Sequence, residues 1–365
     1  MSKPSYTIEQ AAVLVALASG LQVLESFFPH PVPGVRLGLA NIITMIALVR
    51  IGARAAIEIS VLRVFISAMF TGTIFTPAFF IGLSGAVCSS VLMVLFYKAT
   101  IEKGFKILSL TGISVLGAAA HNAAQLGVVY FVFIKSTAVL SFAPVLGISA
   151  VAAGIVTGAV ASAAIRASEK KNTPGVFALK NNIEKKESVI YSIPARITAL
   201  IAADTAVLMS ASAQDFIICS AALLFSSLLM KGSLFSVLTG LKRMSFFIVI
   251  SFSVPFLFGG AAEALTGAAA AEGAVYASRV ALLIGFASCL LYGIDWTRSA
   301  EKGVFSMRPF KIAAGSYAML PGVVDGIKES IKAGFGSGLT VKTAFEKIGY
   351  SVASLYTETV ENKNI

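Results

Sequence analysis

The sequence predicts an all-α, polytopic membrane protein with about ten transmembrane helices, and three observations support this fold class. Hydrophobic residues make up 57% of the 365 residues and charged residues only 13%, whereas a soluble domain carries roughly 25% charged residues. The apolar residues form runs of about 15–25 residues, the length that crosses a bilayer as a helix. These runs lack the alternation of polar and apolar residues that is typical of a membrane β-barrel.

Ten apolar runs are predicted as membrane spans, six before a polar, basic segment at about 166–189 and four after it. They lie near residues 8–28, 37–50, 54–70, 76–97, 107–134, 139–165, 192–210, 216–230, 245–260 and 275–293. The basic segment contains Pro174-Gly175 and several asparagines, which is typical of a linker. Beyond about residue 296 the apolar runs shorten and basic residues recur, as in amphipathic helices at a membrane surface.

The order of these elements predicts two membrane domains. A six-helix bundle occupies residues 1–166, and a cytoplasmic linker follows at 167–189. A second domain at 190–350 contains about four transmembrane helices and cytoplasmic amphipathic helices, and residues 351–365 form a polar tail.

Lysine and arginine indicate the orientation of the chain. With the N-terminus in the cytoplasm, most basic residues fall in cytoplasmic segments, and the outer segments 211–215 and 261–274 contain neither Lys nor Arg. Because basic residues concentrate on the cytoplasmic side, we expect a multi-pass protein of the cell membrane with a cytoplasmic N-terminus. The net charge of +11 then faces anionic lipid. Its basic residues are not interleaved with aromatic residues as on nucleic-acid stacking surfaces, so we expect no nucleic-acid partner.

Polar side chains within the first six spans are candidate ligand-binding residues, because such groups are costly in a bilayer. Arg63 lies about 14 Å and His121 about 21 Å from the cytoplasmic ends of their helices, at 1.5 Å per residue. One interpretation is a pocket in the outer half of the membrane that binds an anionic or carbonyl group. The other is a set of hydrogen bonds and ion pairs that hold the helices together. The candidate residues are Glu25, Arg36, Asn41, Arg63, His121, Asn122 and Gln125.

Several motifs of enzymes and cofactor proteins do not occur in the sequence. It contains no Gly-x-x-x-x-Gly-Lys-Ser/Thr loop for ATP and no Asp-Asp-x-x-Asp motif for Mg²⁺ and a prenyl diphosphate. Its two histidines and three cysteines lack the spacing of metal ligands. We therefore expect a non-enzymatic protein without metal or cofactor.

Residues 10–166 resemble the Gx transporter family, which is also called heptaprenyl diphosphate synthase component I. The resemblance rests on Glu25, the segment from Pro31 to Asn41 that ends in Leu-Gly-Leu-Ala-Asn, Arg63, Ser84-Gly85, and the segment from Gly117 through His121-Asn122 to Gln125. That family resembles the six-helix, substrate-binding S components of energy-coupling factor (ECF) transporters. The resemblance implies that the candidate residues bind a substrate.

Residues 188–345 resemble the transmembrane T component of the same transporters. The similarity lies in Ile193-Pro194-Ala195-Arg196, Leu241-Lys242-Arg243, Ala277-Ser278-Arg279 and Met319-Leu320-Pro321-Gly322. T components contact ECF-type ATPase subunits through short motifs in cytoplasmic helices, where an arginine docks on the ATPase. The resemblance implies that Arg243, Lys328 and Lys332 serve this contact, although the stretch Ile331–Gly336 has lysine in place of the expected arginine.

These observations favour a transport component that takes up a small molecule, anionic or isoprenoid- or vitamin-like, with ATP hydrolysed on a separate subunit. Two alternatives remain open at this point. One is a membrane subunit of a quinone- or flavin-linked redox system. The other is a non-catalytic component of heptaprenyl diphosphate synthesis.

Overall fold

The computed structural model describes residues 6–26, 38–102, 108–134, 137–169, 193–210, 212–230, 233–258, 267–294 and 307–335. Within these ranges every regular element is a helix and no strand occurs. The predicted all-α fold class is therefore confirmed.

The described part of the N-terminal half contains six α-helices and three short irregular helices. They are α1 (Ile8–Glu25), α2 (Ala40–Arg50), α3 (Ala53–Thr71), α4 (Pro77–Tyr97), α5 (Leu110–Val128) and α6 (Ala143–Glu169), with the π-helices η1 (Lys98–Glu102) and η2 (Val129–Ile134) and the 3₁₀-helix η3 (Thr137–Phe142). Each α-helix corresponds to one of the six spans predicted from the apolar runs.

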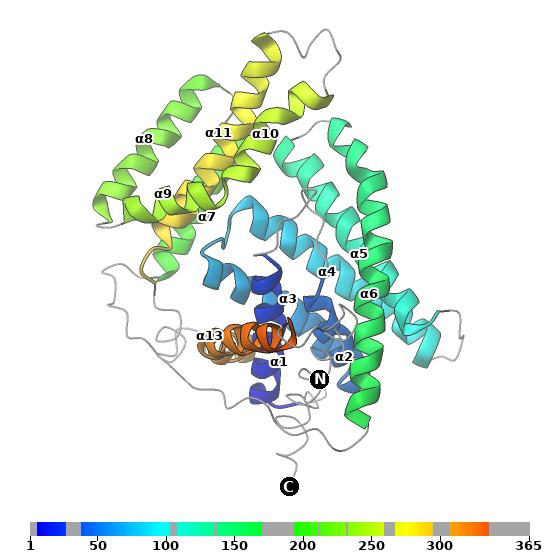
Figure 1. Cartoon of the computed structure of the whole chain (residues 1–365). Helices are drawn as coiled ribbons and strands as arrows, with labels where there is room; N and C mark the ends of the chain where they lie inside the picture. Colours follow the sequence, from blue (N-terminus) through cyan, green and yellow to red (C-terminus); the bar gives the residue numbers. More distant parts are fainter. Residues whose placement is uncertain are drawn as a thin grey trace.

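The described part of the C-terminal half contains a second group of helices. They are α7 (Ile193–Met209), α8 (Ala213–Leu229), α9 (Ser233–Arg243), α10 (Ser245–Phe258), α11 (Gly267–Leu290) and α13 (Arg308–Phe335). Figure 1 shows α7–α11, in green to yellow, at one end of the molecule, whereas the orange α13 lies beside α1 among the N-terminal helices.

Five helical stretches among the described residues are long and apolar enough to cross a membrane. They are Ile8–Glu25, Pro77–Thr100, Leu110–Phe133, Val139–Arg166 and Gly267–Leu290. Shorter apolar helices occur at Ala40–Arg50 and Ala213–Leu229. The chain is therefore a multi-pass membrane protein, and the total of about ten spans stays a prediction.

Local sequence explains where several helices begin and end. Thr7 caps α1 by accepting a hydrogen bond from the Gln10 backbone, and the Gln10 side chain accepts one from the Thr7 backbone. This capping box satisfies two amide groups that have no partner within the helix. A glycine marks the end of α3. Gly72, which follows its last residue, has a φ of 69°, in the left-handed region that glycine adopts without strain.

Two arginines connect the antiparallel helices α7 and α11 in a reciprocal way. Arg196, near the start of α7, donates to the Tyr292 carbonyl at 2.9 Å, just beyond the end of α11. Arg279 of α11 donates to the Ser210 carbonyl at 2.7 Å, just beyond the end of α7. The last carbonyls of a helix have no partner within it, so each arginine satisfies the end of the other helix.

The helix α9 was not predicted from the sequence. Its 11 residues are too few for a span, and they lie in a segment predicted as a cytoplasmic loop. Val237 is buried, and the Ser236 hydroxyl donates to the Ser288 carbonyl of α11 at 3.0 Å. The contact with α11 therefore fixes a short helix that its own apolar length does not indicate.

The largest buried core lies in the N-terminal half, around α1. Its side chains come mainly from α1, α2 and α3, with others from α4, α5 and α6, and also from Ile312, Leu320, Val324 and other residues of α13. The C-terminal segment was predicted to be amphipathic, and the apolar face of its helix α13 packs on α1. The domain boundaries stay predictions. Residues 170–189 of the predicted linker lie outside the described residues, and residues 167–169 are the last turn of α6. A helix from the second predicted domain nevertheless completes the core of the first.

Candidate functional site

A small cavity lies where the six N-terminal helices converge, and each of α1–α6 contributes to its lining. Its volume is about 30 Å³, which is room for about two water molecules. One part of the wall is polar and consists of Gln22, Glu25, Asn41, Arg63, His121, Asn122 and Thr157. The rest is formed mainly by small residues, namely Gly38, Gly82, Ala118, Ala150 and Ala153.

Arg63 is the cationic centre of this wall. It is only 4% exposed, and its guanidinium donates to the Gln22 side-chain oxygen at 2.9 Å and to the Asn41 side-chain oxygen at 2.8 Å. The Ser19 hydroxyl of α1 donates to the Arg63 carbonyl at 3.3 Å. Arg63 therefore joins α1, α2 and α3 at the cavity. Because carboxamide oxygens are neutral, a carboxylate or phosphate of a ligand is a stronger acceptor for the same donors.

Glu25 holds the beginning of α2 at the edge of the cavity. Its two carboxylate oxygens accept the Gly38 and Leu39 backbone amides at 2.7 and 3.2 Å. An acidic group is favourable at a helix N-terminus, where amides lack partners and the helix dipole is positive. Gly38 has a φ of 71°, a conformation that glycine adopts readily. Glu25 thus shapes the pocket by placing α2.

His121 lies directly against the backbone of α4. A methyl group built on Gly85 would come within 2.7–2.8 Å of the His121 ring atoms, so Gly85 provides the space in which the imidazole lies. The position of His121 on α5 therefore requires a residue without a side chain at Gly85.

Asn122, next to His121, connects α5 to α6. Its side-chain nitrogen donates to the Leu146 carbonyl at 2.8 Å and to the Ser149 hydroxyl at 3.2 Å. His121 therefore places its imidazole at the cavity, and Asn122 joins α5 to α6 by hydrogen bonds.

Five of the seven residues predicted to bind a substrate line the cavity, namely Glu25, Asn41, Arg63, His121 and Asn122. Gln125 is buried but is not part of the lining, because it lies one turn beyond His121 on the same helix face. Arg36 lies outside the described residues. Whether any of them binds a ligand stays a prediction.

Sequence reasoning missed two polar residues of the lining, Gln22 and Thr157. Gln22 lies three residues before Glu25, a spacing that places both on one face of α1. Thr157 is a polar residue within the apolar α6, and the Ser114 and Thr157 hydroxyls form a hydrogen bond at 2.9 Å. Both residues could have been predicted from the sequence, because polar side chains within a membrane span are uncommon.

Of the three residues predicted to contact an ATPase, Lys328 is the one whose side chain the structure describes. Lys328 is exposed and forms an ion pair at 3.9 Å with Asp325, one turn earlier on α13. Arg243 ends α9 and Lys332 lies in α13, and their side chains lie outside what the structure describes. Their role in ATPase contact stays a prediction.

Comparison with known proteins identifies a family that is similar to the segment of the chain that forms the cavity. The model of a family described as heptaprenyl diphosphate synthase component I matches residues 14–164, the segment from α1 to α6. No curated protein and no solved structure matches the chain. The match ends before α7, so the T-component likeness of the C-terminal half stays a prediction. The six-helix half that encloses the cavity is therefore the part of the chain that is similar to this family.

Proposed function

We propose that this chain is a membrane uptake component of the ECF type. The six N-terminal helices bind a small molecule in the cavity around Arg63, and the C-terminal helices connect this unit to separate ATPase subunits. The observation that carries the proposal is the cavity itself, because all six helices contribute to it and Arg63 lies in its polar wall.

The lining favours a small ligand with an anionic group. Arg63 is held between two neutral acceptors, Gln22 and Asn41, which an anion outcompetes for charge-assisted hydrogen bonds. The small residues opposite leave space for an apolar body. At about 30 Å³ the cavity is smaller than an ordinary ligand site, so ligand entry requires the helices to separate.

Mass spectrometry of small molecules that co-purify with the protein tests ligand binding. We expect an anionic compound with the wild-type protein that is reduced at least tenfold in Arg63→Gln. Arg50→Gln is the matched control, because Arg50 ties α2 to the Ile165 carbonyl at 2.8 Å and does not line the cavity. An identical ligand profile in wild type and Arg63→Gln would remove Arg63 from the site.

ATPase coupling needs a separate test. Affinity purification from the native membrane is expected to retain an ATPase with a P-loop, and Lys332→Glu is expected to reduce its recovery. If the protein purified without any ATPase but with its ligand fully retained, the chain would be a ligand-binding protein. That result would contradict the transport part of the proposal.

The family description favours one second candidate function, a non-catalytic component of heptaprenyl diphosphate synthesis. Under this alternative the cavity holds an isoprenoid phosphate for a separate catalytic partner. Prenyl transfer that rises when this chain is added to such a partner, and falls in Arg63→Gln, would favour it over transport.

A further inference from the structure

The helix α13 follows α1 in the same direction, although the two are about 300 residues apart in the sequence. At one end the Arg308 side chain donates to the carbonyl of Tyr6, which precedes α1, at 3.2 Å. Near the other end Val323 lies against Gly20. Because the offset between the two helices stays almost constant, they are packed side by side over about four turns.

Small residues allow this close approach. A methyl group built on Gly20 would lie 2.8 Å from Val323, and one built on Gly315 would lie 3.2 Å from the Ala12 side chain. Next to Gly315, the buried Ser316 hydroxyl donates to the Ala12 carbonyl at 2.9 Å. We call these five residues the α13 interface. It combines close packing of small residues with a buried hydrogen bond, as tight helix pairs in membranes do.

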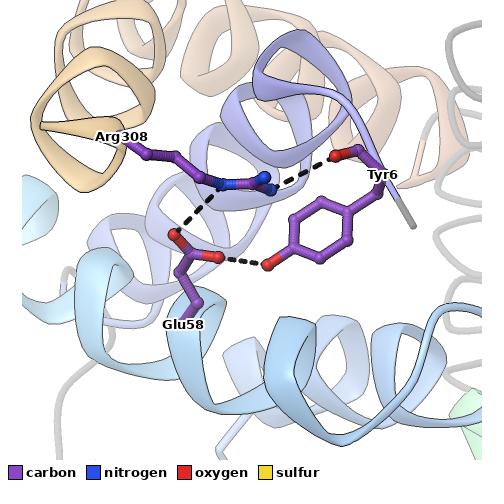
Figure 2. A network of polar contacts seen from close by, with 3 residues as sticks. All are labelled: Tyr6, Glu58 and Arg308. Atoms are coloured by element: carbon purple, nitrogen blue, oxygen red, sulfur yellow. Dashed lines mark hydrogen bonds and ion pairs between the residues drawn. The ribbon is translucent and has the colours of Figure 1, made fainter. Parts of the chain in front are cut away.

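A cluster of three polar residues closes the cytoplasmic end of this interface, in the predicted orientation (Figure 2). The Tyr6 hydroxyl donates to Glu58 of α3, and the Arg308 Nε lies 3.7 Å from the other Glu58 oxygen. The Arg308 guanidinium also lies 4.4 Å from the centre of the Tyr6 ring, within the range of a cation–π contact. Burial raises the pKa of the Tyr6 hydroxyl and its hydrogen bond with Glu58 raises it further, so Tyr6 remains a protonated donor at neutral pH.

The helices α1 and α3, which α13 contacts, carry cavity residues on their other faces. At 100° per residue, Gly20 at the interface and Gln22 at the cavity point to nearly opposite sides of α1. On α3, Glu58 and Arg63 are five residues, or about 140°, apart. Glu25, at the end of α1, holds the beginning of α2. A displacement of α1 away from α13 therefore moves Gln22 and Glu25 relative to Arg63.

We infer that docking of α13 controls the opening of the cavity, through α1 and α3. With α13 docked, the cavity is the small one described above. With α13 displaced, α1 and α3 both lose the helix that packs against them, and the cavity widens. Coupling of this kind is reciprocal, so an occupied, wider cavity weakens the docking of α13. The inference concerns how the proposed ligand site is regulated, but the coupling itself is measured without any ligand.

Hydrogen exchange of the full-length protein in detergent tests the coupling. Glu58→Gln and Arg308→Gln each remove the ion pair at the interface. We expect about tenfold faster exchange at residues 38–45, the beginning of α2, which corresponds to about 1.4 kcal/mol. The double variant is expected to add little to either single change. Glu272→Gln is the matched control, because Glu272 accepts from the Tyr276 hydroxyl on α11 in the same way, far from the cavity.

A disulfide supplies the opposite test and does not depend on a destabilised variant. Ala12→Cys with Gly315→Cys, with the three native cysteines replaced by serine, joins α1 to α13. A Cβ atom built on Gly315 would lie 3.2 Å from that of Ala12, slightly closer than the separation of about 3.5–4.5 Å in a disulfide, so a small shift of the two helices accommodates the bond. Oxidation is expected to slow exchange at residues 38–45 by about tenfold relative to the reduced form of the same protein.

Two results would overturn the inference. One is exchange at residues 38–45 that is the same in the oxidised and reduced pair and in Glu58→Gln. The other is a change of equal size in Glu272→Gln, which would indicate general destabilisation. Neither result bears on ligand binding, whereas an unchanged ligand profile in Arg63→Gln bears on ligand binding alone.

Discussion

The His121 ring depends on a glycine of the neighbouring helix for its position. Gly85 on α4 leaves the space that the imidazole occupies, and no alternative of larger volume fits without displacing the ring. The shape of the pocket therefore depends on this glycine as well as on the polar side chains, because a closely packed interior has no room for an added methyl group.

We therefore predict that Gly85→Ala lowers stability by about 1–3 kcal/mol, the cost of overpacking a buried contact. A lower midpoint of thermal unfolding in detergent would show it. Gly127→Ala is the control, since a methyl group there meets nothing within 4 Å and alanine is the better helix former. Equal melting of the Gly85→Ala and wild-type proteins would contradict the contact with His121.

Arg63 leads to a prediction about ligand chemistry at the same scale. Benzoate and phenyl phosphate are expected to raise the melting temperature of the wild-type protein more than benzylamine or benzamide do, because only the anions replace neutral acceptors on Arg63. Arg63→Gln should abolish the difference between the probes. A response to benzylamine as large as the response to benzoate would argue against an anion site.

At the scale of elements, the position of α2 depends on a carboxylate that comes from α1. Glu25 is 3% exposed and binds two amides at the start of α2. Glu25→Ala leaves both amides without this partner, and an unsatisfied buried group costs about 1–3 kcal/mol.

The expected consequence of Glu25→Ala is faster hydrogen exchange at residues 38–42, with α7–α11 unaffected. Glu25→Gln retains one acceptor oxygen and should show an intermediate rate. Uniform acceleration over the whole chain would indicate global unfolding and would contradict a local capping role.

The sequence predicted most helices but not their rotation about their own axes. Apolar length alone indicated ten of the helices, because lipid imposes that length, and it missed α9, which depends on contact with α11. Depth in the membrane indicated that Glu25, Arg63 and His121 lie close to one another, and they do line one cavity. It did not show that Gln125 lies one turn too far along α5. Such differences depend on packing angles, which no single segment of sequence determines.

At the scale of the whole molecule, one helix of the C-terminal half packs into the N-terminal half. The helix α13 lies beside α1 (Figure 1), and its apolar side chains complete the core around α1, although the resemblance of the sequence to two transporter components suggests two independent units. The pattern of α13 indicated an amphipathic helix but not its partner, because an apolar face fits lipid and protein equally well.

This arrangement predicts that the N-terminal helices need α13 for stability. A chain that ends at residue 306 lacks α13, so α1 loses contacts with Ile312, Leu320, Val323, Val324 and Ile327. Helix pairs in a membrane are stabilised by close packing and hydrogen bonds, and the shorter chain loses both along α1, so we expect its melting temperature to fall by about ten degrees or more. A chain that ends at residue 335 retains the whole of α13 and should melt close to the full-length protein. If both truncated proteins melted alike, the core around α1 would be independent of α13. If only the shorter one melted early, addition of a synthetic α13 peptide should restore part of the loss, because the exposed face of α1 remains complementary to it.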